Sequence, residues 1–322
     1  MYKVYMTVII PLYNKKHTIK NCMLSIENQK RLPDEILIIN DGSTDGSDKI
    51  ASKYRCYFEN MGISFNLISK SNGGVSSARN AGIKAARNDS LLCFFDADDT
   101  WDISYLEEIE RAVITEPNYY IYSSGYNIIF SERVKEKICV KKKKEIVVIN
   151  YNDLNEVGEF PYFPSSFCIN KNAFKYEDLF FPESQDIGED ITCFFLLGIL
   201  YDTVYVNKPL VSYCINTPGN TASNDRPMDL PVAFSLLKGK NSFHGTILTI
   251  KDINYHDYLL LFFLKSCWKS GNISSLRKWC FSWKRLTLSR FFMGIFFFLL
   301  SLAGKKINLW TGSCIKKLKT IF

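Results

Sequence analysis

Short apolar segments alternate with amphipathic segments over the first hundred residues of the chain. Segments rich in apolar residues predict strands over 6–12, 35–40, 63–69 and 91–95. The segments between them carry apolar residues at helical spacing, which predicts helices over 17–29, 47–54 and 72–88. Buried strands that alternate with helices are typical of a mainly parallel α/β sheet covered on both faces.

The middle of the chain is less regular and predicts fewer elements. We expect a strand over 119–127 and an apolar helix over 191–200. The lysine-rich segment 141–145 is typical of a solvated turn between strands. The apolar pieces 204–206 and 210–213 predict a final hairpin.

The chain changes character after about residue 225. Residues 291–303 form an apolar run of 13 residues flanked by lysine and arginine. A membrane-spanning helix needs about 20 such residues, so we expect this run to lie on a membrane surface. We therefore divide the chain into an α/β domain over 1–225 and a helical, basic, aromatic-rich, membrane-associating region over 226–322.

Charge is unevenly distributed along the chain. Residues 258–322 carry 12 Lys or Arg and no Asp or Glu, although the whole chain has a formal charge of only +7. The remainder has 40 − 12 = 28 basic residues against 33 acidic ones, a net charge of −5. Such a tail suits an anionic partner, either nucleic acid or lipid. Its clustered phenylalanines favour an anionic membrane surface, and we expect no nucleic-acid partner.

Cysteine usage points to a reducing compartment. The ten cysteines show no C-x-x-C pair and no metal-ligand spacing with histidine. The first residues read as a short strand and not as a secretory leader. We expect a cytoplasmic protein without a disulfide framework or a thiolate zinc site.

Three polar loops follow the predicted strands directly. They surround Asp41, Gly73–Gly74 and Asp96–Asp99. Because ligands of open α/β sheets bind beyond the carboxyl ends of the strands, we expect these loops to share one rim.

Each loop has a chemical reading and a structural one. Asp96 and Asp98, separated by one residue, could reach one Mg²⁺ or Mn²⁺, or they could form a capping turn. Asp41 could accept hydrogen bonds from a nucleobase or ribose, or close a tight turn. The two glycines and Arg79 could approach a diphosphate at a helix start, or serve close helix–sheet packing.

Glu189 and Asp190 follow Gly188 at the start of the apolar helix. One of them could act as a general base toward an acceptor hydroxyl. Acidic residues are also stabilised there by the helix dipole, and spacing leaves both readings open. The chain has no G-x-S-x-G, Walker A or G-x-G-x-x-G motif, which argues against hydrolase, kinase and dinucleotide-binding functions.

Five motifs, taken together and in order, resemble the family 2 glycosyltransferases of GT-A fold. They are T-V-I-I-P-L-Y-N (7–14), I-I-N-D-G-S-T-D-G-S (38–47), N-G-G-V-S-S-A-R-N-A-G (72–82), F-F-D-A-D-D (94–99) and G-E-D (188–190). The resemblance covers about two thirds of the chain. It implies transfer of a sugar from a nucleotide donor, commonly UDP-linked, with inversion at the anomeric carbon.

The resemblance also implies residue roles on the donor side. Pro11 and Tyr13 would border the nucleotide, Asp41 would recognise the base, and Arg79 would lie beside the nucleotide. The carboxylates that would hold a divalent cation, Mn²⁺ or Mg²⁺, are those of Asp96, Asp98 and Asp99. Of these, Asp98 would hold the metal against the diphosphate, Asp96 would contact metal or ribose, and Asp99 would support either role.

On the acceptor side, Asp190 would deprotonate the acceptor hydroxyl, with Glu189 beside it touching the acceptor. Two positions depart from the family pattern. Asn40 stands where many members carry a second aspartate, and Cys214 and Ile215 stand in a loop where relatives often place Arg or His. Arg226 could substitute for that missing charge.

The resemblance and the basic tail together imply a hexosyl- or N-acetylhexosaminyltransferase of capsule or O-antigen polysaccharide synthesis. Its acceptor would be a glycan or a polyprenyl-diphosphate-linked sugar, at the inner face of the plasma membrane. A non-catalytic, nucleotide-sugar-binding scaffold on the same fold is the alternative. A nucleotidyltransferase would need a basic glycine-rich loop near the first strand, which this chain lacks.

Overall fold

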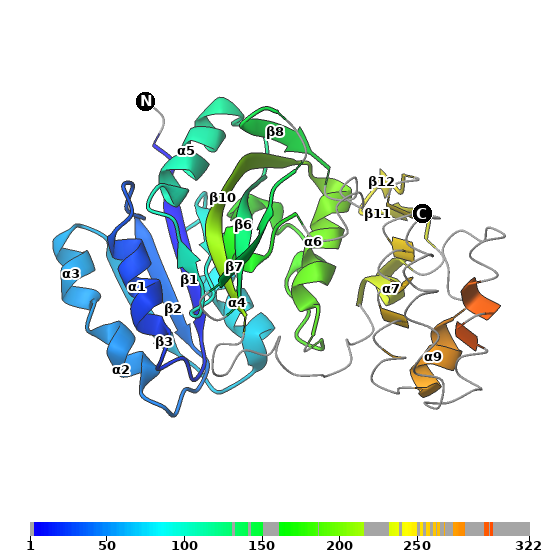
Figure 1. Ribbon diagram of the computed structural model, residues 1–322, viewed down its shortest axis with the longest axis horizontal. Coiled ribbons are helices and arrows are strands. Elements are labelled where there is room, and N and C mark those ends of the chain that lie inside the picture. The colour runs from blue at the N-terminus through cyan, green and yellow to red at the C-terminus, as the bar shows by residue number, and fades with distance from the viewer. Residues whose placement is uncertain are drawn as a thin grey trace.

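The computed structural model has a ten-stranded mixed sheet at its centre, flanked by helices (Figure 1). It describes residues 3–130, 133–140, 143–150, 161–185, 187–215, 232–237, 240–249, 273–280 and shorter pieces of 252–298. The strands are β1 (Met6–Leu12), β2 (Glu35–Asn40), β3 (Ser64–Ser69), β4 (Leu91–Phe94), β5 (Thr100–Trp101), β6 (Ile121–Phe130), β7 (Arg133–Ile138), β8 (Ile146–Ile149), β9 (Phe167–Asn170) and β10 (Thr203–Ile215). Their order is β3-β2-β1-β4-β9-β6-β10-β5, with β7 beside β6 and β8 beside β10.

The first half of the sheet is parallel. Strands β3, β2, β1 and β4 pair in parallel, and every residue of β1, β2 and β4 is buried. These strands confirm the four predicted from apolar runs, to within one residue at each end. Because all four run the same way, their carboxyl ends lie along one rim.

The second half of the sheet is mixed. Strand β9 is antiparallel to both β4 and β6, whereas β6 and β10 are parallel. The hairpin predicted from segments 204–206 and 210–213 is wrong, because both belong to the single strand β10. The pairing of β10 with β6 shifts register around Pro209. Proline has no N–H to donate, so it interrupts the ladder with an irregularity that does not reverse the chain.

Helices cover both faces of the sheet. They are α1 (Ile19–Glu27), α2 (Ser47–Ser52), α3 (Arg55–Asn60), α4 (Gly74–Ala85), α5 (Tyr105–Thr115) and α6 (Glu189–Leu200). Apolar residues of α1, α3 and α5 pack with Val8 and Ile10 of β1, whereas those of α4 and α6 pack in a second cluster with Ile9. Alternate residues of one strand thus face two separate cores. The helix predicted over 47–54 corresponds to α2, which ends two residues earlier, and a separate helix, α3, begins at Arg55.

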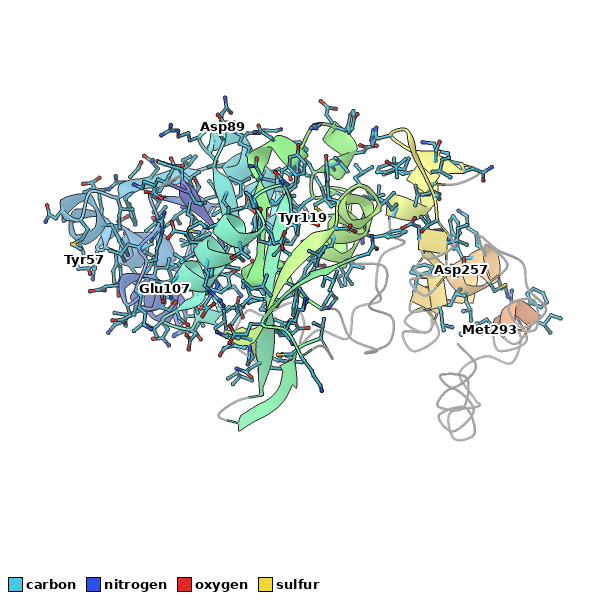
Figure 2. All side chains as sticks on the ribbon, turned by 90° about the horizontal axis from the view of Figure 1, so that it is seen from above. Tyr57, Asp89, Glu107, Tyr119, Asp257 and Met293 are labelled. Atoms are coloured by element: carbon cyan, nitrogen blue, oxygen red, sulfur yellow. The ribbon has the colours of Figure 1, made fainter. Side chains whose placement is uncertain are left out.

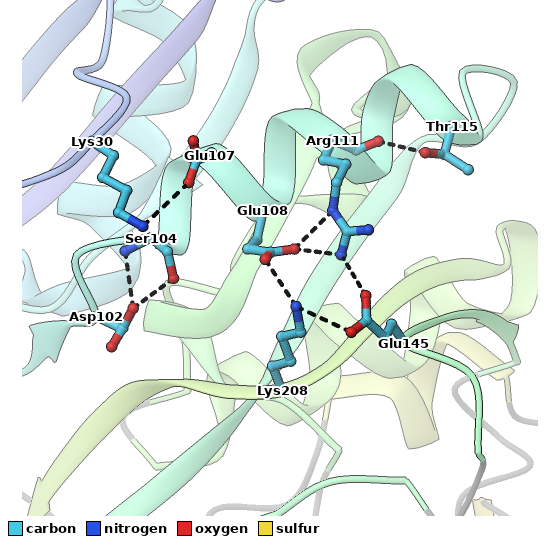
Figure 3. Close-up of polar contacts among 9 residues, drawn as sticks. All are labelled: Lys30, Asp102, Ser104, Glu107, Glu108, Arg111, Thr115, Glu145 and Lys208. Atoms are coloured by element: carbon cyan, nitrogen blue, oxygen red, sulfur yellow. Dashed lines mark hydrogen bonds and ion pairs between the residues drawn. The ribbon is translucent and has the colours of Figure 1, made fainter.

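A polar network holds α5 against β10 and the end of the predicted lysine-rich turn (Figure 3). Glu108 of α5 accepts hydrogen bonds from Lys208 Nζ at 2.9 Å and from Arg111 Nη2 at 2.6 Å. Arg111 also donates to Glu145 at 3.2 Å. Residues 143–145, the described part of that turn, are exposed and lie between β7 and β8, as predicted.

The described part of the C-terminal region forms a small helical body beside α6. It contains α7 (Val232–Leu237), α9 (Ile273–Trp279) and a two-stranded sheet of β11 (Ser242–Phe243) and β12 (Thr246–Ile247). Short 3₁₀ helices η2 (Pro164–Ser166), η3 (Lys171–Ala173) and η4 (Glu177–Leu179) lie earlier in the chain. Figure 2 places Tyr57 of α3 and Met293 at opposite ends of the molecule.

Part of the apolar run predicted over 291–303 can be located. Met293 and Phe297 are buried in the same core cluster as α6 and α7, whereas Phe298 is exposed. The rest of that run, and the boundary near residue 225, lie outside the described residues. Within the residues that are described, no helix is both long enough and apolar enough to span a bilayer.

Candidate active site

The rim at the carboxyl ends of β1, β2, β3 and β4 brings the predicted loops together. Lys70, directly after β3, donates to Asp41 after β2 at 2.7 Å. Lys15, after β1, donates to Asp98 after β4 at 2.6 Å. The prediction that the polar loops share one edge is therefore confirmed.

Asp41 organises the start of α4. Its carboxylate is 2% exposed and accepts the backbone N–H groups of Gly73 and Gly74 at 2.8–3.1 Å, besides Lys70 Nζ. A Cβ on Gly73 would lie 2.8 Å from Ser77 Oγ and 2.9 Å from Lys70 Nζ, so a side chain there would require Ser77 and Lys70 to move. Asp41 thus holds the glycine loop in place from inside the rim.

The side-chain amide of Asn40 joins the loop after β2 to the end of β3. Asn40, one of the two departures from the family pattern, accepts from Ser43 N at 3.0 Å and donates to Ser69 at 3.3 Å. Its amide therefore stabilises the loop after β2. Pro11 is buried in β1, whereas the Tyr13 side chain is 49% exposed at the rim. An exposed aromatic ring there can stack on a planar ligand.

The three aspartates after β4 occupy different environments. Asp96 is 24% exposed at its side chain and Asp98 11%, whereas Asp99 is 1% exposed. Asp99 accepts from Ser165 Oγ at 2.5 Å and from Cys214 N at 3.1 Å. Burial, and then the charges of Asp98 and Asp96, raise the pKa of Asp99 well above its ordinary value.

Ser165 ties this loop to the rest of the sheet. Its Oγ donates to Asp99 and accepts from the backbone N–H of Asp96 at 3.0 Å. Its carbonyl accepts from Trp101 Nε1 at 2.7 Å, and the Trp101 ring stacks on Phe95 at 3.9 Å between centroids. The acidic loop is therefore held in place by Ser165 and by the stacked rings of Phe95 and Trp101.

Arg79 joins the carboxylates predicted for the donor side to those predicted for the acceptor side. It projects from α4, is 3% exposed, and donates to Asp96 at 2.9 and 3.1 Å and to Glu189 at 2.9 Å. Its guanidinium carbon lies 5.1 Å from the ring centroid of Phe181. Burial lowers the pKa of Arg79, but Asp96 and Glu189 raise it more strongly, so the side chain stays cationic.

Glu189 and Asp190 begin α6 after Gly188, whose φ of 82° is left-handed. Asp190 Oδ1 accepts from Ile191 N at 2.8 Å. Burial, with the neighbouring charge of Asp190, raises the pKa of Glu189 to about 7 despite the opposing charge of Arg79. Burial also raises the pKa of Asp190, again against Arg79. The pair therefore holds a proton more tightly than ordinary carboxylates do.

The acidic loop and the start of α6 belong to one site. Tyr213 on β10 lies within reach of carboxylates from both. Burial is the main cause that raises the pKa of Tyr213, and the charges of four aspartates add to it: Asp99, Asp190, Asp96 and Asp98. Lys15 and Arg79 pair with carboxylates of this group. The acidic residues exceed these two cations, so an anionic diphosphate would need further positive charge to bind here.

The donor set suits a divalent cation that is shared with a ligand. In the described part of the chain, no three His, Cys, Asp or Glu side chains are arranged to enclose a metal ion. Asp96 and Asp98 nevertheless offer two partly exposed carboxylates at one rim. Mg²⁺ usually takes one or two protein carboxylates and completes its shell with water and substrate phosphates, so these residues fit such an ion.

Sequence reasoning did not identify several residues of this site. Ser165 and Lys70 carried no motif signal, because their roles depend on contacts with distant loops. Lys15 lies two residues after Tyr13, in the loop predicted to border the nucleotide. Its positive charge at that position was the one feature of the sequence that could have indicated a role in the site. Cys214 donates its N–H to Asp99, whereas Arg226 lies outside the described residues.

Comparison with known proteins finds a family match over the part of the chain that builds the rim. Residues 7–166 match Glycosyl transferase family 2. Glycosyltransferase GlyA of Streptococcus pneumoniae is 28% identical over 218 residues, which cover 65% of this chain and 30% of the relative. Glycosyltransferase AglE of Haloferax volcanii is 26% identical over 174 residues, covering 49% and 56% respectively. The chain thus spans less than two thirds of the length of either relative.

Solved structures share the fold. The crystal structure of S. aureus TarS 1–349 in complex with UDP-GlcNAc aligns with a TM-score of 0.66 and 17% sequence identity, over 87% of this chain and 82% of that one. The alignment supports the predicted GT-A architecture of a mixed sheet with flanking helices.

Proposed function

We propose that the protein is an inverting, nucleotide-sugar-dependent glycosyltransferase, from the premise that residues 7–166 match the glycosyl transferase family 2. The observation that carries the proposal is the position of Arg79. It pairs with Asp96 at the predicted donor carboxylates and with Glu189 at the predicted acceptor side. One buried side chain thus links the two halves of a transfer site.

The donor lies along the rim in this proposal. Tyr13 and Pro11 border the base, and the loop organised by Asp41 and Gly73 follows the nucleotide. Asp98 and Asp96 hold a divalent cation, Mn²⁺ or Mg²⁺, which when bound offsets charge on the departing diphosphate. Asp99, turned inward onto Ser165, supports the loop that presents the other two carboxylates.

Asp190 acts as the general base. It takes the proton of the acceptor hydroxyl as that oxygen attacks the anomeric carbon from the face opposite the diphosphate. One displacement inverts the centre and requires no enzyme nucleophile. Glu189 lies beside the acceptor. Through its bond to Arg79, which also binds Asp96, it fixes the position of the base relative to the donor carboxylate.

We further propose a UDP-linked hexose or N-acetylhexosamine as donor and a glycan or polyprenyl-diphosphate-linked sugar as acceptor. The UDP-GlcNAc complex of TarS, which shares the fold, supports the choice of donor. The basic, aromatic tail supports binding to an anionic membrane surface, which we take to be the inner face of the plasma membrane. The pathway in this proposal is capsule or O-antigen synthesis.

The experiment is a transfer assay with the full-length protein. UDP-, GDP- and dTDP-sugars are offered with Mn²⁺ or Mg²⁺ and a short lipid-diphosphate sugar, and mass spectrometry detects an added sugar. Asp98→Asn and Asp190→Asn should abolish the product, whereas Asp89→Asn, the same change at an exposed position, should leave it intact. Nucleotide binding without turnover in any combination would favour the scaffold alternative, and absence of nucleotide binding would refute the donor site.

A further inference from the structure

Lys15 stands at the point where the proposed metal would bind. It lies in the loop between β1 and α1, and its ammonium contacts Asp98 Oδ2 at 2.6 Å across 83 positions of sequence. The two side chains are only 15% and 11% exposed. A pair so shielded from water interacts more strongly than an exposed surface pair.

The backbone around Lys15 is held in place from both sides. Asn14, with a left-handed φ of 51°, donates its N–H to Ser43 Oγ and accepts from Thr44 N at 2.9 Å. The carbonyl of Lys15 accepts from the N–H groups of Thr18 and Ile19 at 3.1 and 2.9 Å. The loop thus delivers the Lys15 side chain to the acidic loop after β4.

An ammonium and a divalent cation compete for the Asp98 carboxylate. A metal ion binds a carboxylate oxygen at about 2.1 Å, so an ammonium 2.6 Å from Oδ2 would lie within direct repulsion of it. The metal alone must therefore displace Lys15 from a shielded pair. A diphosphate arriving with the metal offers the displaced ammonium new anionic oxygens.

We propose that Lys15 couples binding of the divalent cation to binding of the donor diphosphate, by holding Asp98 until both are present. The inference rests on the proposed function, since it takes the ligands to be a divalent cation and a nucleotide diphosphate. In this scheme Lys15 weakens metal binding to the ligand-free protein and no longer weakens it when nucleotide is bound. Such coupling is reciprocal, so Mn²⁺ and UDP raise each other's affinity by the same factor.

The test titrates the full-length protein with Mn²⁺ alone, following free Mn²⁺ by electron paramagnetic resonance. Lys15→Met should bind Mn²⁺ about tenfold more tightly than wild type without nucleotide. With saturating UDP the two proteins should bind Mn²⁺ equally well. In the wild type Lys15 then contacts the diphosphate and no longer holds Asp98. Lys16→Met, the same change at the exposed neighbouring residue, should match the wild type in both conditions.

Two further variants keep the test decisive. Asp98→Asn added to Lys15→Met should remove the gain, which locates the metal at Asp98. Lys15→Gln, with a polar side chain, should reproduce the gain if Lys15→Met folds poorly in a thermal melt. Equal Mn²⁺ affinity of the wild type and both Lys15 variants without nucleotide would overturn the proposal. Those titrations contain no sugar, so their result is independent of whether sugar transfer is found.

Discussion

Neighbouring residues of the acidic loop have different chemistry because they face different partners. Asp98 is bound by a lysine at the rim, whereas Asp99 is buried against Ser165 and Cys214. Asp96 is the most exposed of the three and is held by Arg79. At the scale of single residues, partner and burial therefore determine which carboxylates can meet a ligand.

Arg79→Lys should uncouple the two halves of the site while preserving charge. One ammonium cannot reproduce the forked contacts that Arg79 makes with Asp96 and Glu189, and it leaves a buried carboxylate without its partner. We expect a loss of about 2 kcal/mol in the free energy of unfolding and at least about 100-fold in kcat/KM. Chemical denaturation and the transfer assay measure the two effects.

Arg87→Lys is the matched control, because Arg87 lies just beyond the same helix but is exposed. It should change neither stability nor turnover appreciably. Equal effects of the two substitutions would contradict the bridging role of Arg79.

The Glu189–Asp190 pair should make activity depend on pH near neutrality. The base, Asp190, must be deprotonated to act, and burial raises its pKa above the ordinary aspartate value, while burial raises the pKa of Glu189 beside it to about 7. We therefore expect kcat/KM to rise with pH over a range higher than that of an ordinary aspartate. The raised pKa of Glu189 makes the native state hold a proton that the unfolded chain loses above 4.5, so this group's contribution to stability falls between pH 4.5 and about 7.

Glu189→Gln identifies the origin of that pH dependence. It removes a negative neighbour of Asp190, and the rising limb of the pH–rate profile should move to lower pH. A limb that stays in place would show that the pair does not control the protonation of the base.

Helix α4 shows how one element serves both fold and site. Its start is held by Asp41, Arg79 projects from its middle toward the carboxylates, and Gly82 lies against β1. A Cβ on Gly82 would come within 2.4 Å of Ile9 Cγ2. The small residue at this position therefore sets how closely α4 approaches the sheet.

Gly82→Ala should destabilise the protein by about 1–3 kcal/mol, because the added methyl overpacks the contact with Ile9. Chemical denaturation provides the measurement. The sign is diagnostic: Gly to Ala inside an unobstructed helix gains stability, by up to about 1 kcal/mol. A stabilised variant would mean that α4 is not held at this distance from β1.

At the scale of the whole molecule, charge is divided between two regions. Residues up to 257 carry a net charge of −5, and residues 258–322 carry +12. A basic region of this size is attracted to anionic lipid by about 1 kcal/mol for each Lys or Arg near the surface, and salt weakens the attraction.

Replacing five lysines of the last stretch by glutamate should release the protein from anionic vesicles. The substitutions are Lys305→Glu, Lys306→Glu, Lys316→Glu, Lys317→Glu and Lys319→Glu. Sedimentation with vesicles of anionic and of neutral lipid, at low and high salt, measures binding. Wild-type protein should pellet with anionic vesicles at low salt only, and binding by the substituted protein would contradict a role for tail charge.

Much of the fold followed from local patterns. The apolar runs predicted β1, β2, β3 and β4 because a strand buried on both faces must be apolar along its length. The family match over residues 7–166 also contains the first four of the five ordered motifs. The predicted hairpin failed because the polar residues before Pro209 resemble a turn, whereas pairing with β6 and β8 keeps β10 in one strand.

The sequence by itself determined which polar loops lie together, since polar residues directly after buried parallel strands must emerge at one rim. Only the tertiary structure decided which charges meet: Lys15 with Asp98 across 83 positions, and Arg79 with Glu189 across 110. Local periodicity records whether a side chain is buried. It does not record its partner, because an ion pair between distant segments depends on how the whole sheet and its helices pack.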